Sequence, residues 1–271
     1  MNYERIFFPL WMGAGVKTFV PNGCDALLAA FNHAGFEIPV SQHANLEKTD
    51  FIKAKPELLE AMKLLKTALH GKTRIALLGG DCSSDYVLLA HSSQLYGQDL
   101  AVVWLDTHAD LNTPISSPSG HFHGMVLRAN LGDSDPDFAA FNPHPIVPRQ
   151  VFLAGARDFD TPELEYVRTH KIHISSVTEL QADPSSLAQA IAKAGYSKIH
   201  VHLDLDVQKS FASASFSKPD GLDLTSLLAV IHSLKKQFEV ISFAVTEYAP
   251  QTQNADLETV LTLIHALEER P

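Results

Sequence analysis

Ala101-Val102-Val103-Trp104-Leu105-Asp106-Thr107-His108-Ala109-Asp110 joins an unbroken apolar run to two carboxylates and an imidazole. Such a run is typical of a strand that is buried on both faces of a parallel sheet. Side chains alternate along a strand, so Asp106, His108 and Asp110 share one side if the extended conformation continues, and a loop brings them closer still. The stretch therefore predicts a metal site at the end of a buried strand.

A second acidic pair has the same arrangement. Asp204 and Asp206 close the apolar run Ile199-His200-Val201-His202-Leu203. Four aspartates held together need positive charge to offset their repulsion, and two divalent ions bridged by one aspartate of each pair supply it. His200 and His202 lie within the run, so we expect them in the core or behind the ligands rather than on a metal.

The composition is typical of one cytoplasmic enzyme domain. The 271 residues are 45% hydrophobic and contain no linker or repeat, which favours a single domain over residues 1–271. The net charge of −10 argues against a nucleic acid partner. Cys24 and Cys82 are too few for a disulfide framework. Ile6–Val16 is read as a first strand and loop rather than a signal peptide, and no run approaches the roughly 20 apolar residues that span a membrane.

Strand-like and helix-like segments alternate along the chain. Apolar runs predict strands at Ile6–Leu10, Arg74–Leu78, Ala101–Leu105, Val151–Ala154, Lys171–Ser175, Lys198–Leu203 and Val240–Val245. Helical spacing marks Pro56–His70, Ser84–Leu95, Pro184–Lys193 with Asp183 as N-cap, Leu224–Gln237 with Asp223 as N-cap, and Leu257–Glu269. The alternation predicts a three-layer α/β/α fold around a mainly parallel sheet.

Polar groups follow five of the predicted strands. They are Gly79–Cys82, Asp106–Asp110, Gly155–Asp160, Asp204–Asp206 and Glu247. Ligands of open parallel sheets bind beyond the carboxyl ends of the strands, so we expect these groups in one crevice. Carboxylates favour Mn²⁺ or Mg²⁺, while imidazole and thiolate widen the choice to Zn²⁺ and Fe²⁺.

Taken in order, these segments resemble the ureohydrolases, the arginase and agmatinase superfamily. The matching segments are Gly79–Ser83, Trp104–Pro114, Ser119–Gly124, Asp204–Asp206 and Glu247. They span most of the chain, and the Asp-x-His-x-Asp-x-Asn-Thr-Pro string is the most specific of them. The resemblance implies a single domain with an arginase-like fold, two Mn²⁺ ions, hydrolysis of guanidino groups to urea, and a homo-oligomer.

The resemblance also implies roles for individual residues. It implies that one ion is bound by Cys82, Asp106, Asp110 and Asp204, and that the other is bound by Asp106, His108, Asp204 and Asp206. A hydroxide between the ions would attack the guanidinium carbon. The catalytic side chains would be Asp110, which passes a proton to the leaving amine, His123, which shuttles protons or contacts substrate, and Glu247, which pairs with the guanidinium.

The substrate implied by the resemblance is an α-amino acid with a guanidino group. Asn112 and Ser119 match positions that bind the α-carboxylate, and Asp160 matches one that contacts the α-amino group, with Glu163 assisting. His121 stands at the amino acid end in place of a family asparagine. These matches favour L-arginine or a close analogue over agmatine, which has no carboxylate.

Cys82 is the main departure from the family pattern, because most members have a histidine ligand there. A thiolate is softer and favours Zn²⁺, Fe²⁺ or partial occupancy. Val207–Ser210 and Tyr248 also differ from the pattern. A cysteine at this position also occurs in a branch that hydrolyses Nω-hydroxy-L-arginine to hydroxyurea. That activity, a formiminoglutamase-type hydrolase and a metal-depleted binding or regulatory homologue stay open as alternatives.

Overall fold

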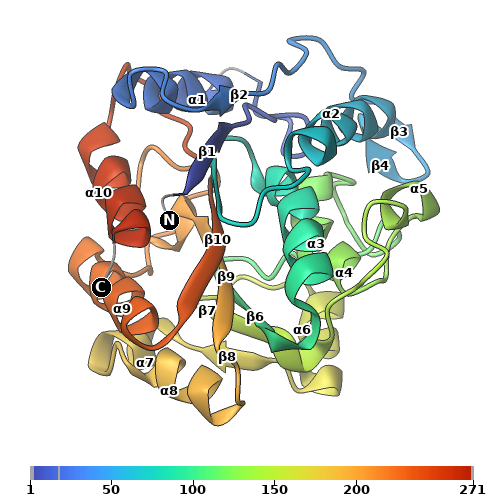
Figure 1. The fold of residues 1–271 in the computed structure, drawn as a ribbon. Helices are drawn as coiled ribbons and strands as arrows, with labels where there is room; N and C mark the ends of the chain where they lie inside the picture. Colours follow the sequence, from blue (N-terminus) through green and yellow to red (C-terminus); the bar gives the residue numbers. More distant parts are fainter. Residues whose placement is uncertain (1–2, 18, 270–271) are drawn as a thin grey trace.

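An eight-stranded sheet forms the centre of the molecule in the computed structural model, which describes residues 3–17 and 19–269 (Figure 1). The strand order is β2-β1-β5-β10-β9-β6-β7-β8, and every neighbouring pair is parallel. The strands are β1 (Glu4–Phe7), β2 (Phe36–Glu37), β5 (Ile75–Leu78), β6 (Leu100–Leu105), β7 (Val151–Ala154), β8 (His173–Ser175), β9 (Lys198–Asp204) and β10 (Glu239–Thr246). The predicted α/β fold with a mainly parallel sheet is confirmed.

Helices cover both faces of this sheet and make three layers (Figure 1). One face carries α2 (Lys55–Ala68), α3 (Asp85–Tyr96), α4 (Val126–Asn130), α5 (Pro136–Ala139) and α6 (Thr161–His170). The other carries α1 (Phe19–Ala30), α7 (Val177–Ala182), α8 (Ser186–Lys193), α9 (Leu224–Gln237) and α10 (Leu257–Glu268).

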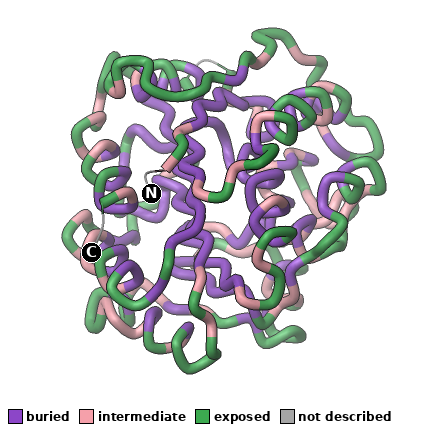
Figure 2. Tube along the Cα trace, in the orientation of Figure 1, coloured by how far each residue is buried: buried purple, intermediate pink, exposed green. Residues whose placement is uncertain are grey.

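Strands β5, β6 and β7 are buried along their whole length, and β9 and β10 are buried after their first residue (Figure 2). A hydrophobic cluster lies on each face of the sheet. In β6, Leu100, Val102 and Trp104 pack into the first cluster, on the face that carries α2 to α6, and the residues between them pack into the second cluster, on the other face. This is the reason that β6 reads as a continuous apolar run.

Several elements differ from the sequence prediction. The short β2 and the hairpin of β3 (Lys48–Thr49) and β4 (Ile52–Lys53) were not predicted, because two residues carry no readable periodicity. Helix α1 was missed since it contains Pro21 and Gly23, which disfavour helix, and α6 and α7 are short and largely polar.

The predicted N-cap at Asp183 is wrong. Helix α8 begins at Ser186 with Ser185 at the N-cap, whereas Asp183 ends α7 and its carboxylate accepts a hydrogen bond from the Ser185 amide. Asp223 does cap α9 as predicted, because its carboxylate accepts from the Ser226 amide at 2.7 Å. Within residues 3–17 and 19–269, no helix is long and apolar enough to cross a membrane.

We expect Asp223→Ala to lower the free energy of unfolding by about 1 kcal/mol, because the first turn of α9 loses its side-chain acceptor. Urea unfolding followed by circular dichroism measures the change. Asp223→Asn is the matched control, since an amide oxygen still accepts from Ser226. Equal stability of Asp223→Ala and the unaltered protein would contradict the assignment of this cap.

Candidate metal centre

The carboxyl ends of four adjacent strands bring the predicted metal residues together. Strands β5, β10, β9 and β6 are neighbours in that order. Register pairs Leu78 with Val245, and Thr246 with Asp204, so the segments that follow these strands leave the sheet side by side. The sequence separates these ends by up to 165 residues, as between Cys82 and Glu247, yet the Cys82 amide donates to Glu247 Oε1 at 3.2 Å.

Three overlapping groups of candidate ligands form at these strand ends. They are Cys82, Asp106, Asp110 and His202; Cys82, Asp204 and Glu247; and Asp106, His108 and Asp206, with the ligand atoms of each group within 4.8 Å of one another. Asp106 belongs to two of the groups and Cys82 to two. The groups bring together all six residues to which the sequence assigned a metal role.

Direct distances show how closely these side chains approach. Cys82 Sγ lies 3.1 Å from Asp204 Oδ2, and His108 Nδ1 lies 3.0 Å from Asp206 Oδ2 and 3.5 Å from Asp106 Oδ1. Asp204 joins Cys82 and Glu247 rather than the group of Asp106 and His108.

The backbone is strained where two of these acidic side chains leave their loops. Asp110 and Glu247 have φ values of 52° and 61°, in the left-handed region that residues with a Cβ rarely adopt. Gly79 and Gly80, just before Cys82, have φ values of 82°. These positions lie at the strand ends where the acidic groups meet.

Burial and mutual repulsion dominate the electrostatics of the centre. Burial, and then the charge of Asp106, raises the pKa of Asp110 well above its usual range, and burial with Asp206 does the same for Asp204. Burial and Asp106 raise the pKa of Asp206 to about 6. Burial acts to lower the pKa of His108, but its bonds to Asp106 and Asp206 raise it to about 12. When these acidic groups are ionised together, they repel one another unless a positive charge lies nearby.

Unpartnered oxygen atoms show that a divalent cation fits these residues. Asp110 Oδ2 and Glu247 Oε2 are buried and have no hydrogen-bond partner among the described residues, whereas Asp206 Oδ2 faces His108 Nδ1. Such atoms are costly unless something binds them. Carboxylate, imidazole and thiol groups around these atoms are a ligand set that divalent metals take.

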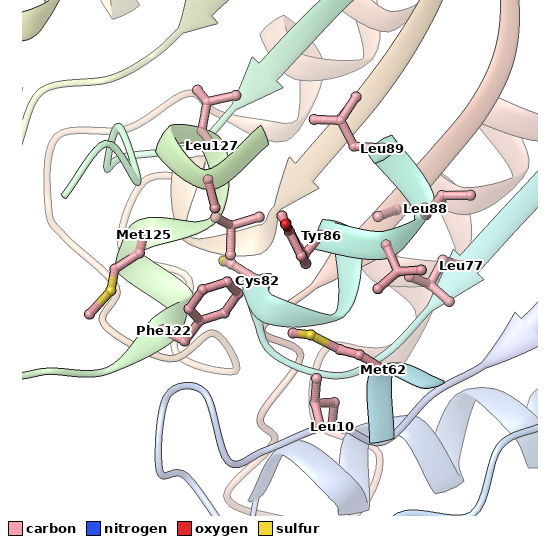
Figure 3. Close-up of a cluster of buried hydrophobic side chains, with 14 of the residues drawn as sticks. Leu10, Met62, Leu77, Cys82, Tyr86, Leu88, Leu89, Phe122, Met125 and Leu127 are labelled. Carbon is pink, nitrogen blue, oxygen red and sulfur yellow. The ribbon is translucent and has the colours of Figure 1, made fainter. Parts of the chain in front are cut away.

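Cys82 borders both the acidic centre and the apolar core. Figure 3 shows Cys82 between Tyr86 of α3 and the helical turn Phe122–Met125. Cys82 belongs to the first hydrophobic cluster. Burial, and then Asp204, raises the pKa of the Cys82 thiol well above its usual range. A thiolate here therefore needs a cation beside it.

The residues matched to the amino acid end of a substrate form two separate hydrogen-bonded groups. Asn112 Nδ2 donates to Asp160 Oδ2 at 2.8 Å. The two oxygens of Glu163 accept from the Leu111 and Asp160 amides, so this buried carboxylate holds the two segments together. Ser119 is exposed and accepts from the His121 amide at 3.1 Å.

His123 lies against Glu247, with Nδ1 3.6 Å from Oε1. Burial acts to lower the pKa of His123, but its bond to Glu247 outweighs this and raises it. The His121 ring lies 5.9 Å from the His123 ring. The structure thus places His123 beside Glu247 and His121 beside His123.

Sequence reasoning missed the position of His202. Both His200 and His202 are buried as expected, but His202 is a member of the first ligand group. It lies two residues before Asp204, and residues two apart share one side of a strand. This alternation is the feature of the sequence that could have placed His202 on the same side of the strand as Asp204.

Solved arginases share this fold over their whole length. The arginase of Entamoeba histolytica in complex with L-ornithine aligns with a TM-score of 0.88 at 23% identity, covering 98% of this chain and 99% of that one. The arginase of Bacillus caldovelox aligns with a TM-score of 0.86 at 26% identity, covering 100% and 99%. Formimidoylglutamase from Bacillus subtilis aligns with a TM-score of 0.71 at 17% identity, covering 99% and 87%.

Curated arginase sequences match shorter parts of this chain than the solved structures do. Arginase of Staphylococcus aureus (strain COL) is 35% identical over 136 residues, which are 48% of this chain and 44% of the relative, so the match spans less than half of that protein. Arginase of Plasmodium berghei is 27% identical over 230 residues, which are 80% of this chain and 63% of the relative. The Arginase family model matches residues 23–270. This chain belongs to the Arginase family.

Proposed function

We propose that this protein is a metal-dependent amidinohydrolase that cleaves the guanidino group of L-arginine, or of a close analogue such as Nω-hydroxy-L-arginine, to urea or hydroxyurea and an amine. The observation that carries the proposal is the cluster of buried carboxylates with unpartnered oxygens beside Glu247. Membership of the Arginase family supports the reaction type.

Two divalent ions are the proposed cofactors. Cys82, Asp106, Asp110 and Asp204 would hold one, and Asp106, His108, Asp204 and Asp206 the other. Bound cations offset the carboxylate charge and make a water molecule acidic enough to act as a nucleophile near neutral pH. Mn²⁺ suits the oxygen-rich second set, and Cys82 makes the first set also suitable for Zn²⁺ or Fe²⁺.

Three acidic and basic side chains would act on the substrate itself. Glu247 Oε1 is held by the Cys82 amide, which leaves Oε2 unpartnered for a guanidinium N–H. Ion pairing of a planar cation with a carboxylate both binds and orients it. Asp110 Oδ2 is likewise unpartnered and would carry a proton to the leaving amine, with His123 beside Glu247 as a proton shuttle.

The amino acid end of the substrate would lie over the two hydrogen-bonded groups described above. Asn112 and Ser119 would contact the α-carboxylate, and Asp160, His121 and Glu163 the region of the α-amino group. Glu163 would act by holding Asp160, because both of its oxygens already accept backbone hydrogen bonds. The cytoplasmic location and the homo-oligomer stay predictions.

The protein loaded with Mn²⁺ should release urea from L-arginine or hydroxyurea from Nω-hydroxy-L-arginine, and should turn over agmatine poorly, because agmatine has no carboxylate for Asn112 and Ser119. Product analysis by mass spectrometry distinguishes these reactions. Formamide released from N-formimino-L-glutamate as the main product would assign the formiminoglutamase reaction instead. No turnover of any of these compounds by protein with bound metal would contradict the enzymatic proposal.

His123→Asn should lower kcat by about 10² to 10⁴-fold and leave the metal content unchanged, because it removes a proton shuttle but no proposed ligand. Steady-state kinetics and elemental analysis of the same sample measure both. His144→Asn, at an exposed loop position, is the matched control and should keep full activity. An unchanged kcat in His123→Asn would remove this residue from the mechanism.

The Co²⁺-loaded protein should show a thiolate-to-metal charge-transfer absorption that disappears in Cys82→Ser. Cys24→Ser is the matched control, because Cys24 is also buried but its thiol donates to the Leu78 carbonyl at 3.6 Å and belongs to none of the ligand groups. Absorption that survives in Cys82→Ser would show that Cys82 is not a ligand.

A further inference from the structure

His202 faces the first group of metal ligands from strand β9. The side chain is fully buried, and Nε2 lies 3.8 Å from Asp106 Oδ2 and 3.5 Å from Thr246 Oγ1. Thr246 Oγ1 in turn lies 3.8 Å from Cys82 Sγ. A ligand atom of His202 is within 4.8 Å of one from each of Cys82, Asp106 and Asp110. Nε2 is therefore directed at the centre rather than at the core.

Two contacts fix the orientation of this ring. Nδ1 lies 2.8 Å from Asp85 Oδ2, and the ring stacks on the Trp104 indole with centroids 3.6 Å apart and planes 4° apart. Asp85 Oδ2 lies within hydrogen-bond distance of both His200 and His202, so its carboxylate can accept the Nδ1 proton of His202. A neutral ring that donates through Nδ1 has its lone pair on Nε2, as in carboxylate–histidine–metal arrangements.

His200 is the informative contrast, because it lies on the same strand and bonds the same carboxylate. Its Nε2 is 2.9 Å from Asp85 Oδ2, and its Nδ1 is 2.8 Å from Ser242 Oγ. Ser242 Oγ continues the chain of hydrogen bonds to Ser92 Oγ at 2.8 Å. Both nitrogens of His200 therefore have partners away from the centre. The Nε2 atom of His202 instead contacts Thr246 Oγ1, which lies beside Cys82, and faces Asp106.

We propose that His202 Nε2 is a ligand of the first ion, together with Cys82, Asp106 and Asp110. The inference rests on the proposed function, because it requires a metal at the strand ends. A thiolate, an imidazole and carboxylates are a set that Zn²⁺ binds readily. The resemblance assigns no imidazole to this ion, since Cys82 stands where the family has histidine. Strand β9 supplies the imidazole instead, with Asp85 and Trp104 as its positioning residues.

A crystal structure of the full chain loaded with Zn²⁺ tests this directly. An ion in the first group should lie about 2.0–2.1 Å from His202 Nε2. Two bound ions with Nε2 outside bonding distance would overturn this inference and leave the proposed function standing. If no ion binds at the strand ends, both fail.

A matched pair of variants gives the same test in solution. Calorimetric titration of His202→Leu with Zn²⁺ should show that the affinity for one ion falls by more than about 100-fold, while the other ion still binds. Loss of a group that only supports a ligand lowers metal affinity by about 10- to 100-fold. His200→Leu, which removes the same kind of buried bond to Asp85, should keep both binding events. Equal weakening in the two variants, with folding verified by circular dichroism, would mean that His202 only supports the structure and would overturn the inference. If His202→Leu does not fold, the crystal structure decides.

Discussion

Mutual repulsion among buried carboxylates is the constraint on which the rest of the centre depends. Asp106, Asp110, Asp204, Asp206 and Glu247 all meet at the ends of adjacent strands, out of contact with water. Buried charges of one sign are tolerated only when an opposite charge lies among them. Within the described chain, His108 supplies part of that charge by holding a proton between Asp106 and Asp206. A divalent cation can replace the proton and serve more of the carboxylates at once.

The parallel sheet makes this concentration of charge possible. Its central strands are buried on both faces, so their backbone bonds form a rigid support that does not depend on the loops. Strands far apart in the sequence become neighbours through crossover helices, and their carboxyl ends open on one edge. The strained backbone at Asp110 and Glu247 aims two acidic side chains inward, which is the kind of cost that functional sites carry.

The fold and the meeting of the acidic residues at the strand ends were readable from the sequence because they depend on local patterns. Apolar runs that end in aspartate mark β6 and β9, and the strand-end rule then groups their acidic residues. Elements set by tertiary contacts were not readable: β2 pairs with β1 although it has only two residues, and α1 forms despite Pro21 and Gly23. Alternation from Asp204 places His202 on one side of β9, but only the neighbouring strands show whether that side faces the core or the acidic centre. Asp85, which orients it, has no signal of its own at the start of a helix.

The mass of the intact folded chain, measured by native mass spectrometry after loading with Mn²⁺ and removal of free ion, tests the central claim most directly. We expect a mass that exceeds that of the metal-free chain by two metal ions, and loss of both ions on treatment with a chelator. A chain that keeps its metal-free mass after loading would contradict it, because the buried carboxylates would then be balanced without metal.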